Sequence, residues 1–431
     1  MAHLRAAWHE YLEAVRAFSR PARFYLLTEL LAWTGHGVFQ VLFNLYLVAG
    51  GFTESFVGQA ISLNALGLAL TAMPAGFLAD RWGRRRCLLL GAALDGAGMV
   101  ARSALVSPGL ILGASFVAGA GQALLAIAAA PFLTEHSSTR ERTHLFSAFF
   151  ATALAAGVAG SVLGGWIPWT LQGLPADLRP DTLHGYRIAL LVGAALGLGA
   201  MVPLLRLSGL KEANFTSDAA TTGRETVRTL APIGINAILI GAGAGLVIPF
   251  MNLYFAQRFD CSSGQIGMFF AVAQISTAAA ALLGPVLARR FGKLRTATAF
   301  ELLSLPFLVT LGAERRLAVA VGAFWLRATL MQASSPLIQA FVMESLPAAL
   351  RARASSLTNM LWNAGWAVSA TLAGVIIQRF GYAVPFYITA VLYGSAAVFF
   401  YRWFRGTPEE GAKIRLSEEA KGQRGEGVFT E

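Results

Sequence analysis

The sequence predicts an all-α membrane protein with twelve transmembrane helices in two pseudo-symmetric six-helix bundles. The chain has 431 residues, of which 56% are hydrophobic and 13% are charged, and this is too apolar for a fully hydrated surface. Long apolar runs recur along the chain, and only helices and closed barrels satisfy their backbone hydrogen bonds in hydrocarbon. Short motifs of the first half also return in the second half, which indicates a duplication.

Residues 1–20 precede the first apolar run and are predicted to form an interfacial amphipathic helix. Apolar side chains recur at helical spacing between Leu4 and Phe18, and charged residues lie elsewhere around the helix. Glu10 and Glu13 interrupt this segment, and the next apolar run is long enough to span a bilayer. A cleaved signal peptide is therefore not expected.

Twelve apolar runs follow, each close to the roughly 20 residues that a transmembrane helix needs. The first six form a predicted N-terminal bundle at 21–207, and the last six a C-terminal bundle at 229–404. Residues 208–228 are predicted to be a cytoplasmic linker, and 405–431 a disordered cytoplasmic tail. The predicted spans are 24–50, 56–79, 87–106, 109–134, 145–170, 188–205, 230–257, 262–288, 296–313, 317–343, 354–378 and 382–401.

Basic residues concentrate in alternate loops, which predicts the orientation. One cluster follows the second span and another follows the eighth, whereas the loops on the other side are poor in Lys and Arg. The positive-inside rule then places both termini in the cytoplasm and explains the formal charge of +11 without nucleic acid. Cys87 and Cys261 fall on opposite sides, so no disulfide is expected between them. The two clusters are Arg81, Arg84, Arg85 and Arg86, and Arg289, Arg290, Lys293 and Arg295.

Several motifs repeat in the same order with nearly the same spacing. Gly83 corresponds to Gly292 (292 − 83 = 209), and the sequence Asn-Leu-Tyr at 44–46 returns at 252–254, an offset of 208. The pair Glu135 and Arg142 recurs as Glu344 and Arg351, again at an offset of 209. Parallel repeats of this kind enclose a central cleft at the membrane midplane, where transporters bind solutes.

The segment after the second span is Gly76-Phe-Leu-Ala-Asp80-Arg81-Trp-Gly83-Arg84-Arg85-Arg86. It resembles the G-x-L-a-D-r-x-G-r-r signature of the major facilitator superfamily, and span count, charge pattern and duplication agree with it over nearly the whole chain. A weaker copy at 289–293 keeps the glycine and the basic residues but lacks the acid. The resemblance implies a secondary transporter that works by alternating access, closest in pattern to drug/proton antiporters with twelve helices.

Nine residues around these loops form a predicted cytoplasmic gate. We expect Gly76 to allow two helices to approach, Gly83 to permit a tight reversal, and Asp80 to accept hydrogen bonds from Arg84 or a helix N-terminus. The resemblance implies that the acid engages the start of the eleventh span near Ser355. A simple topogenic charge cluster is the alternative. The nine residues are Gly76, Asp80, Arg81, Gly83, Arg84, Glu135, Arg142, Glu344 and Arg351.

Ionisable residues inside the spans are costly, so each is a candidate for substrate binding or proton coupling. In the first span Glu29, His36 and Gln40 fall on one helical face with Asn44 close to it, which predicts a titratable stripe. The resemblance places the first, fourth, seventh and tenth spans around the cavity. The alternative is that Glu29 reaches the cytoplasmic interface and His36 is a packing residue.

The remaining candidates lie on other spans. Arg327 and Ser334 share a face of the tenth span, where a permanent positive charge needs an acidic partner such as Glu301 or an anionic ligand. Asp95 is either a proton site or a structural partner. Polar and aromatic groups suited to an amphipathic solute complete the set, namely Gln122, Asn359, Trp362 and Asn363.

The predicted function is proton-coupled export of small amphipathic or drug-like solutes by a monomer, with no cofactor and no nucleic-acid partner. The segment 160–165 resembles the superfamily's antiporter motif but has serine in place of its proline. The chain contains no nucleotide-binding loop, metal cluster or nucleophile–base constellation that would suggest an enzyme. Uptake of an organic anion, translocation of a lipid or lysolipid, and a non-transporting receptor or scaffold remain alternatives. The expected location is the cytoplasmic membrane of a bacterium.

Overall fold

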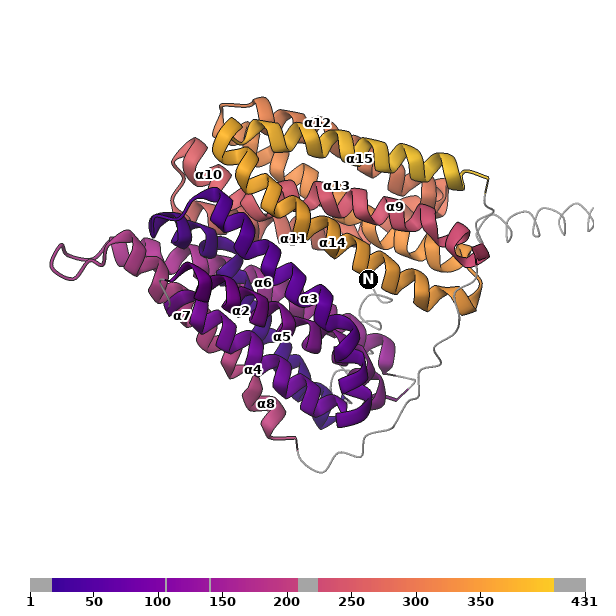
Figure 1. The fold of residues 1–431 in the computed structure, drawn as a ribbon, viewed down its shortest axis with the longest axis horizontal. Helices are drawn as coiled ribbons and strands as arrows, with labels where there is room; N and C mark the ends of the chain where they lie inside the picture. Colours follow the sequence, from indigo (N-terminus) through magenta and orange to yellow (C-terminus); the bar gives the residue numbers. More distant parts are fainter. Residues whose placement is uncertain (1–17, 105–106, 139–140, 208–223, 407–431) are drawn as a thin grey trace, which may run out of the picture. The chain divides into compact units, whose positions relative to one another are not determined.

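The fold is described from a computed structural model, which places residues 18–104, 107–138, 141–207 and 224–406. The predicted tail, most of the predicted linker and nearly all of the predicted interfacial helix lie outside these residues. The described part contains twelve long helices (Figure 1). They are α2 (Arg20–Ala49), α3 (Glu54–Trp82), α4 (Arg84–Ala104), α5 (Pro108–Glu135), α6 (Arg142–Gln172), α7 (Thr182–Gly199), α9 (Arg224–Val247), α11 (Ser263–Phe291), α12 (Lys293–Ala313), α13 (Leu317–Ser345), α14 (Ala348–Phe380) and α15 (Ala383–Phe404).

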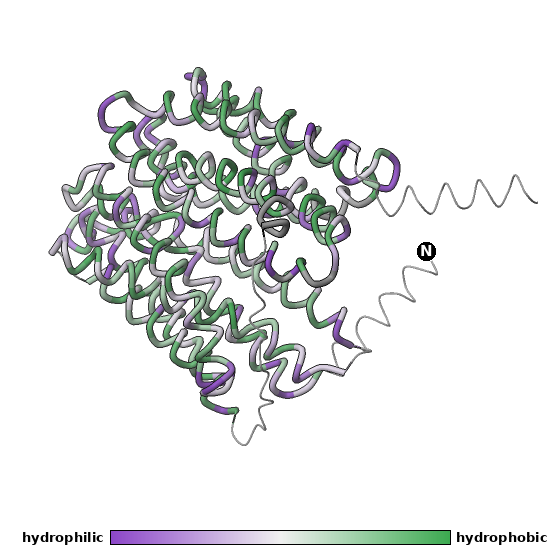
Figure 2. Tube along the Cα trace, turned by 45° about the vertical axis from the view of Figure 1, so that its right-hand side comes forward, coloured by the Kyte–Doolittle hydropathy of each residue, from purple (hydrophilic) through white to green (hydrophobic). Residues whose placement is uncertain are grey.

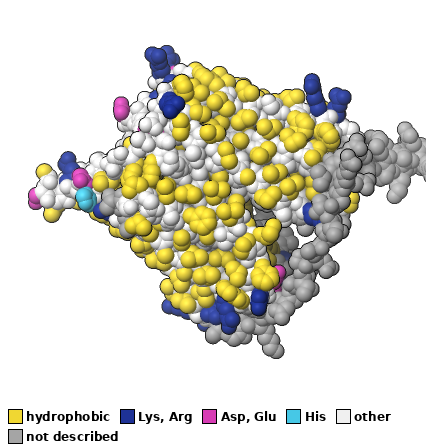
Figure 3. All heavy atoms as spheres, in the orientation of Figure 1, with side chains coloured by type: hydrophobic (Ala, Val, Ile, Leu, Met, Phe, Trp, Pro, Cys, Tyr) yellow, Lys and Arg dark blue, Asp and Glu magenta, His cyan; other side chains and the backbone are white. Residues whose placement is uncertain are grey.

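Three short helices extend the long ones: α8 (Met201–Leu205) follows α7, and η1 (Ile248–Phe250) and α10 (Met251–Phe259) follow α9. Ten stretches are long and apolar enough to cross a membrane. Helices α2 and α11 are not among them, although they have 30 and 29 residues. In α2 the polar stripe that includes Glu29, His36 and Gln40 lowers the hydropathy. Figure 2 shows hydrophobic residues along the helices, and hydrophobic side chains dominate the face drawn in Figure 3.

The predicted duplication is visible in the helix boundaries. Helix α3 begins at Glu54 and helix α11 at Ser263, and both the starts and the ends of these helices are related by the offset of 209 found in the sequence. The same offset relates α4 to α12. Between the helices of each pair stands a glycine with nearly the same backbone conformation: Gly83 has φ 92° and ψ 149°, and Gly292 has φ 88° and ψ 153°. Only glycine adopts this region without strain, so both copies of the reversal depend on it.

We expect Gly83→Ala and Gly292→Ala each to destabilise the protein by about 1–3 kcal/mol, because a side chain at positive φ is strained whatever the surrounding space. Thermal unfolding of each purified variant measures the effect. Gly109→Ala is the control, since its added Cβ would meet no atom within 4 Å and its φ is not positive. Equal unfolding temperatures for all three variants would contradict the prediction.

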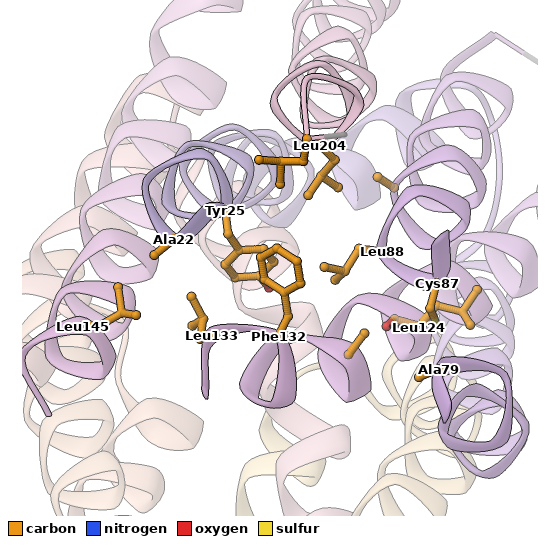
Figure 4. Close-up of a cluster of buried hydrophobic side chains, with 14 of the residues drawn as sticks. Ala22, Tyr25, Ala79, Cys87, Leu88, Leu124, Phe132, Leu133, Leu145 and Leu204 are labelled. Carbon is orange, nitrogen blue, oxygen red and sulfur yellow. Dashed lines mark hydrogen bonds between the residues drawn. The ribbon is translucent and has the colours of Figure 1, made fainter. Parts of the chain in front are cut away.

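The chain divides into two compact units, and their boundaries do not follow the repeats. Unit 1 contains the first repeat together with Gly245–Gln274 and Ala367–Gly381, and unit 2 contains the rest of the second repeat. In unit 1, a hydrophobic cluster lies beside the first basic loop, where Tyr25 packs against Phe132 with ring centroids 5.6 Å apart (Figure 4). A corresponding cluster in unit 2 includes Phe341, Phe400 and Phe404.

The segments of the second repeat that belong to unit 1 pack closely on the first repeat. A Cβ at Gly267 of α11 would lie 2.5 Å from Ser161 O and 2.9 Å from Gly165 Cα of α6. Hydrogen bonds reinforce the contact, because Ser263 Oγ donates to Gly165 O at 3.0 Å. We call this packing of α6 on α11 the far-end contact, since it involves the ends of both helices remote from the basic loops.

A second contact of the same kind joins α3 to α14 within unit 1. Ser62 Oγ donates to Ala367 O, and Thr371 Oγ1 donates to Ser62 Oγ at 2.6 Å. Gly58 lies against the backbone of Ala370, where a Cβ would overlap the carbonyl oxygen. Small residues therefore let the helices of the two repeats approach to backbone distance on both sides of unit 1.

Cys261 lies just before α11, outside the predicted spans, and its environment makes it unreactive. Burial, with a smaller contribution from Asp260, raises the pKa of its thiol to about 11. The thiolate fraction at pH 8 is therefore about 0.001, and we expect alkylation at least about 100-fold slower than that of an exposed thiol. The experiment compares two alkylation rates. The first is that of Cys261 in a Cys87→Ala background, and the second is that of an exposed thiol, Ser262→Cys, in a chain lacking both native cysteines. Labelling should accelerate as the pH rises toward 11; equal rates at pH 8 would contradict the prediction.

Candidate functional site

The polar stripe predicted on the first span lies on α2. Two glycines on other faces of α2 determine which way the stripe faces, because they pack against neighbouring helices. Helix α2 packs mainly on α6 and α7. A Cβ at Gly37 would lie 2.8 Å from Gly160 Cα of α6, and one at Gly35 would lie 2.5 Å from Gly193 O of α7. These close contacts direct the remaining face, with Glu29, His36 and Gln40, away from α6 and α7.

His36 binds the buried carboxylate of Asp95, which the sequence did not predict. His36 Nε2 lies 2.9 Å from Asp95 Oδ2, and Gln122 Nε2 donates to Asp95 Oδ1 at 3.2 Å. The side chain of Asp95 is 2% exposed and that of His36 is 24% exposed, so the imidazole connects the buried carboxylate to the accessible face of α2. The backbone of Gly121 touches that of Asp95, which brings α5 close enough for Gln122 to reach the carboxylate.

Arg102 lies two turns along α4 from Asp95 and is also buried. Its guanidinium group lies over the rings of Phe39 and Phe43, at 5.0 and 4.9 Å from their centroids. Within the described residues its Nε has no hydrogen-bond partner. Asp95 therefore lies between a titratable imidazole and a permanent positive charge. Asp95 thus has partners on two neighbouring helices, His36 on α2 and Gln122 on α5.

Glu29 is buried and bound by neutral donors. Trp33 Nε1 donates to Glu29 Oε1 at 2.6 Å, and the hydroxyl of Tyr25 donates to Oε2 at 3.4 Å. Its side chain is thus directed inward rather than toward an interface. The Trp33 ring is 46% exposed and lies 6.0 Å from the His36 ring, so it adds an aromatic surface to the stripe. Trp33 stands four residues after Glu29, a spacing that could have identified it.

Asn44 ends the stripe and pairs with Asn252, the residue that corresponds to it in the second repeat. Asn44 Nδ2 donates to Asn252 Oδ1 at 3.1 Å and to Pro249 O at 2.5 Å. Asn252 Nδ2 in turn donates to the carbonyl groups of Val41 at 2.9 Å and Gln40 at 3.3 Å. Both asparagines are buried and belong to unit 1, so Asn44 joins helices of the two repeats, whereas the Gln40 side chain is exposed.

In unit 2, Arg327 of α13 is buried against α15. Its Nη2 donates to the hydroxyl of Tyr393 at 3.2 Å, and the guanidinium group lies 5.7 Å from the centre of that ring. Ser334 is buried two turns along α13, within hydrogen-bonding range of the Glu301 carboxyl group. Within the described residues Arg327 forms no ion pair shorter than 4 Å, with Glu301 or any other acid. Nothing in the sequence pattern pointed to Tyr393.

The predicted residues of α14 form hydrogen bonds only within their own helix. Asn359 Nδ2 donates to Ser355 O at 3.0 Å, and Asn363 Nδ2 donates to Asn359 O at 2.8 Å. The rings of Trp362 and Trp366 lie 5.0 Å apart. Asn359 is exposed, and Asn363 and Trp362 are half-buried, so these groups are not committed to a neighbouring helix by a hydrogen bond.

Two ion pairs of the described residues lie at the predicted gate in equivalent positions, although Lys293 of the second pair was not among the nine predicted residues. Arg84 pairs with Glu135, and Lys293 pairs with Glu344, so both members of the second pair stand at the repeat offset of 209 from those of the first. Arg142 and Arg351 bind carbonyl groups in the preceding loops, those of Ser137 and Leu346 among them. Glu135 and Arg142 therefore belong to different interactions and do not pair with each other.

Two expectations for the gate motif differ from the structure. Arg84 binds Glu135 rather than Asp80, which is half-buried and has no hydrogen bond or ion pair to any described residue. A Cβ at Gly76 would meet only Ile127, at 4.0 Å, so no close helix approach depends on this glycine here. Arg81 lies over the ring of Phe77 at 5.9 Å. The predicted reversal at Gly83 agrees with its positive φ.

The two gate pairs differ in exposure, which gives a prediction. The side chains of Arg84 and Glu135 are 9% and 16% exposed, whereas those of Lys293 and Glu344 are 31% and 30% exposed. Exposed pairs contribute about 0–1 kcal/mol, but removing one partner of a buried pair costs several times more. We therefore expect Glu135→Gln to lower the thermal unfolding temperature clearly more than Glu344→Gln, its matched control. Equal shifts would show that burial does not distinguish the pairs.

The comparisons with known proteins agree with this architecture. The family profile described as Major Facilitator Superfamily matches residues 25–231 and 233–429. No curated protein matches the chain at a significant level. Among solved structures, a bacterial homologue of the human lysosomal transporter Spinster, in an inward-facing and occupied conformation, superposes with a TM-score of 0.73 at 16% identity. That match covers 90% of this chain and 97% of the homologue.

Two further structures show the same fold. The nucleoside transporter NupG has a TM-score of 0.71 at 14% identity, and the match covers 90% of this chain and 99% of NupG. A D-xylose–proton symporter has a TM-score of 0.69 at 16% identity, and the match covers 93% of this chain and 99% of the symporter. At these identities the likeness concerns the fold alone.

Proposed function

The chain belongs to the Major Facilitator Superfamily, and on this premise we propose that it is a proton-coupled exporter of small amphipathic solutes. The fold is that of multi-pass membrane transporters, so the proposal concerns the solute, the direction and the coupling ion. We further propose that the protein lies in the cytoplasmic membrane of a bacterium. The distribution of Arg and Lys favours basic loops and both termini on the cytoplasmic side. The contact between His36 and Asp95 is the observation that carries the coupling.

This contact suits proton exchange because it combines three properties. Asp95 is almost fully buried, where a lone carboxylate would be costly, and its oxygens are held by His36 and Gln122. His36 is partly exposed, and histidine is the side chain that ordinarily titrates near neutral pH. A proton taken up by the imidazole from water can therefore be stabilised by a carboxylate that water does not reach, and loss of the contact would release it.

The remainder of the stripe supports an amphipathic solute. The exposed ring of Trp33 and the side chain of Gln40 lie on the same face of α2 as His36, so apolar and hydrogen-bonding surface are adjacent. Residues 160–165 resemble an antiporter motif, but the serine in place of its proline weakens the case for export that the motif makes. In this chain those glycines pack α6 on α2 and α11, with Gly160 against Gly37 and Gly165 against Gly267.

Reconstituted protein tests the proposal directly. Proteoliposomes with an imposed pH gradient should accumulate or expel an amphipathic fluorescent dye, and an ionophore that collapses the gradient should abolish the uphill movement. Flux that persists unchanged after collapse would exclude proton coupling. If no compound that stabilises the protein is moved at all, a receptor or scaffold would be favoured, and a fluorescent lysolipid in the same assay tests lipid translocation.

An organic anion is a second candidate for the cargo, because Arg327 carries a positive charge with no acid within 4 Å in the described residues. In that case Arg327→Ala should abolish the binding of anions and leave the binding of neutral compounds unchanged. Thermal stabilisation by a panel of anionic and neutral ligands measures both.

A further inference from the structure

Unit 2 contains a buried carboxyl group, that of Glu301, which the proposed coupling site does not use. Helix α12 packs on both α13 and α15. Glu301 of α12 and Arg327 of α13 both act electrostatically on Tyr393 of α15, so the three side chains belong to one interior region. Their exposed fractions are 3%, 4% and 1%. The Glu301 carboxyl group and the Arg327 guanidinium group are thus both removed from water in the same unit. Whether each is charged depends on the groups that bind it.

Glu301 and Arg327 are bound separately rather than to each other. The Arg327 guanidinium group is held by the hydroxyl and ring of Tyr393, and its Nε has no hydrogen-bond partner. The Ser334 hydroxyl lies near the Glu301 carboxyl group but donates its hydrogen to Met331 O at 2.8 Å, and Glu301 Oε2 has no partner. Both orphaned atoms are buried, and the absence of partners holds among the described residues.

Among the described residues, Arg327 and Glu301 are the charged groups that act on Tyr393. Gly243 of α9 lies against its ring, where an added Cβ would be 2.6 Å from a ring carbon, and Thr389 Oγ1 donates to Gly243 O at 3.0 Å. Helix α9 therefore contributes glycine and backbone at this point. The titratable and charged groups of the cluster are Glu301 on α12, Arg327 on α13 and Tyr393 on α15.

These observations determine which group carries a proton. Arginine remains charged in proteins, and here its charge is compensated only by the hydroxyl dipole and the ring of Tyr393. An ionised Glu301, buried and without a salt bridge to any described residue, would retain the full penalty of desolvation. The neutral carboxylic acid avoids this penalty.

We propose that Glu301 is a second proton-carrying group of the transport cycle and that Arg327 controls it by changing partners. In the conformation described here, the proton is on Glu301 and Arg327 is bound to Tyr393. In the alternate state Arg327 leaves Tyr393 and forms an ion pair with Glu301. The carboxyl O–H bond then breaks, the proton passes to water, and the carboxylate is neutralised by the guanidinium group. The proposal adds to the function proposed above and does not depend on the contact between His36 and Asp95.

The duplication supports a pair of carboxyl sites. Helices α4 and α12 are equivalent at an offset of 209, so Asp95 corresponds to Ser304. Glu301 stands one turn before Ser304 on the same helix and is therefore at a similar depth. Each repeat thus has one buried acid on its equivalent third helix, but the partners differ: His36 in unit 1, and Tyr393 with Arg327 in unit 2. The positions equivalent to Glu301 and Arg327 in the first repeat are Ala92 and Ala118, so the second arrangement is not a relic of duplication.

Infrared spectroscopy of the full chain in lipid tests the proton directly, because the carbonyl stretch of a protonated carboxyl group is distinct from the bands of a carboxylate. The measurement is made in a Glu29→Gln background, because Glu29 is also buried and bound by neutral donors. There we expect such a band at neutral pH and its loss when Glu301→Gln is added. Asp177→Asn, which removes an exposed acid, is the control and should leave the band unchanged. Absence of the band at neutral pH, or its persistence in Glu301→Gln, would overturn the assignment. Glu301→Asp should shift the band and supplies a second variant if the glutamine variant does not fold.

A separate variant tests the change of partners. Tyr393→Phe removes the hydroxyl that holds Arg327, so the guanidinium group should move to Glu301 and ionise it, and the band should disappear at neutral pH. A band that remains unchanged in Tyr393→Phe would refute the switch while leaving the protonated carboxyl group in place. Both measurements use pH alone and require no substrate. Failure of gradient-driven flux in proteoliposomes would count against the proposed function without changing these spectra.

Discussion

Replacing Gly267 with leucine is expected to open the far-end contact of unit 1 and to lower the stability of the protein. The added Cβ would lie 2.5 Å from Ser161 O and 2.9 Å from Gly165 Cα, and both are backbone atoms of α6. A flexible side chain could move aside, but these atoms cannot move without displacing the helix. Inserting bulk at such a site costs about 1–3 kcal/mol or more, and separation of α6 from α11 is the alternative to that strain.

Separation also breaks hydrogen bonds that depend on the approach. Ser263 Oγ would lose Gly165 O, now 3.0 Å away, and Gln274 Nε2 would lose Ser161 Oγ, now 2.9 Å away. Since the contact joins helices of both repeats, a transporter that cannot form it would lose one of the closed states that alternating access requires.

Two measurements on one variant test the expectation. Thermal unfolding reports the strain, and labelling of Ser263→Cys by a membrane-impermeant maleimide, in a background without Cys87 and Cys261, reports the opening. Ser263 is buried in the unmodified chain, so labelling should be slow until Gly267→Leu is added. Gly113→Leu is the matched control, because a Cβ there would meet no atom within 4 Å. Continued protection of Ser263→Cys in the Gly267→Leu variant would show that α6 and α11 tolerate the bulk without separating.

Sequence patterns predicted the elements of this molecule better than their partners. Hydropathy indicated twelve spans, and the recurrence of Gly83 as Gly292 indicated two repeats, because length and local conformation are encoded locally. Helical periodicity also placed Glu29 and His36 on one face of α2. Periodicity does not determine which neighbouring helix that face meets, so the contact of His36 with Asp95 appeared only in the structure.

Partner choice at the gate shows the same limit. The sequence contained Arg84, Glu135 and Asp80, and proximity along the chain favoured a bond between Arg84 and Asp80. The glycines of α4 and α5 decide otherwise, because Gly91 and Gly121 bring these helices together and so bring Glu135 to Arg84. Arg327 was likewise identified as a buried charge, but its partner Tyr393 is 66 residues away and belongs to no motif.

The second large effect is expected for Asp95→Asn, which should abolish proton-coupled flux and also destabilise the protein. The amide cannot carry the negative charge that stabilises a protonated His36, so a proton on the imidazole loses its buried partner. The same change also removes the acid that acts electrostatically on the buried Arg102. Removing one partner of a buried charge pair typically costs about 3–5 kcal/mol, because the remaining charge is uncompensated.

A second substitution separates the two consequences. In Asp95→Asn with Arg102→Gln, no uncompensated charge remains on α4, so the unfolding temperature should recover most of its loss. Flux driven by a pH gradient should not recover, because His36 still has no carboxylate beside it. Asp177→Asn again serves as the control for loss of a carboxylate. If Asp95→Asn retains gradient-driven flux, Asp95 has only a structural role beside Arg102. Proton coupling must then reside elsewhere, and the other buried carboxyl groups of the described residues are Glu29 and Glu301.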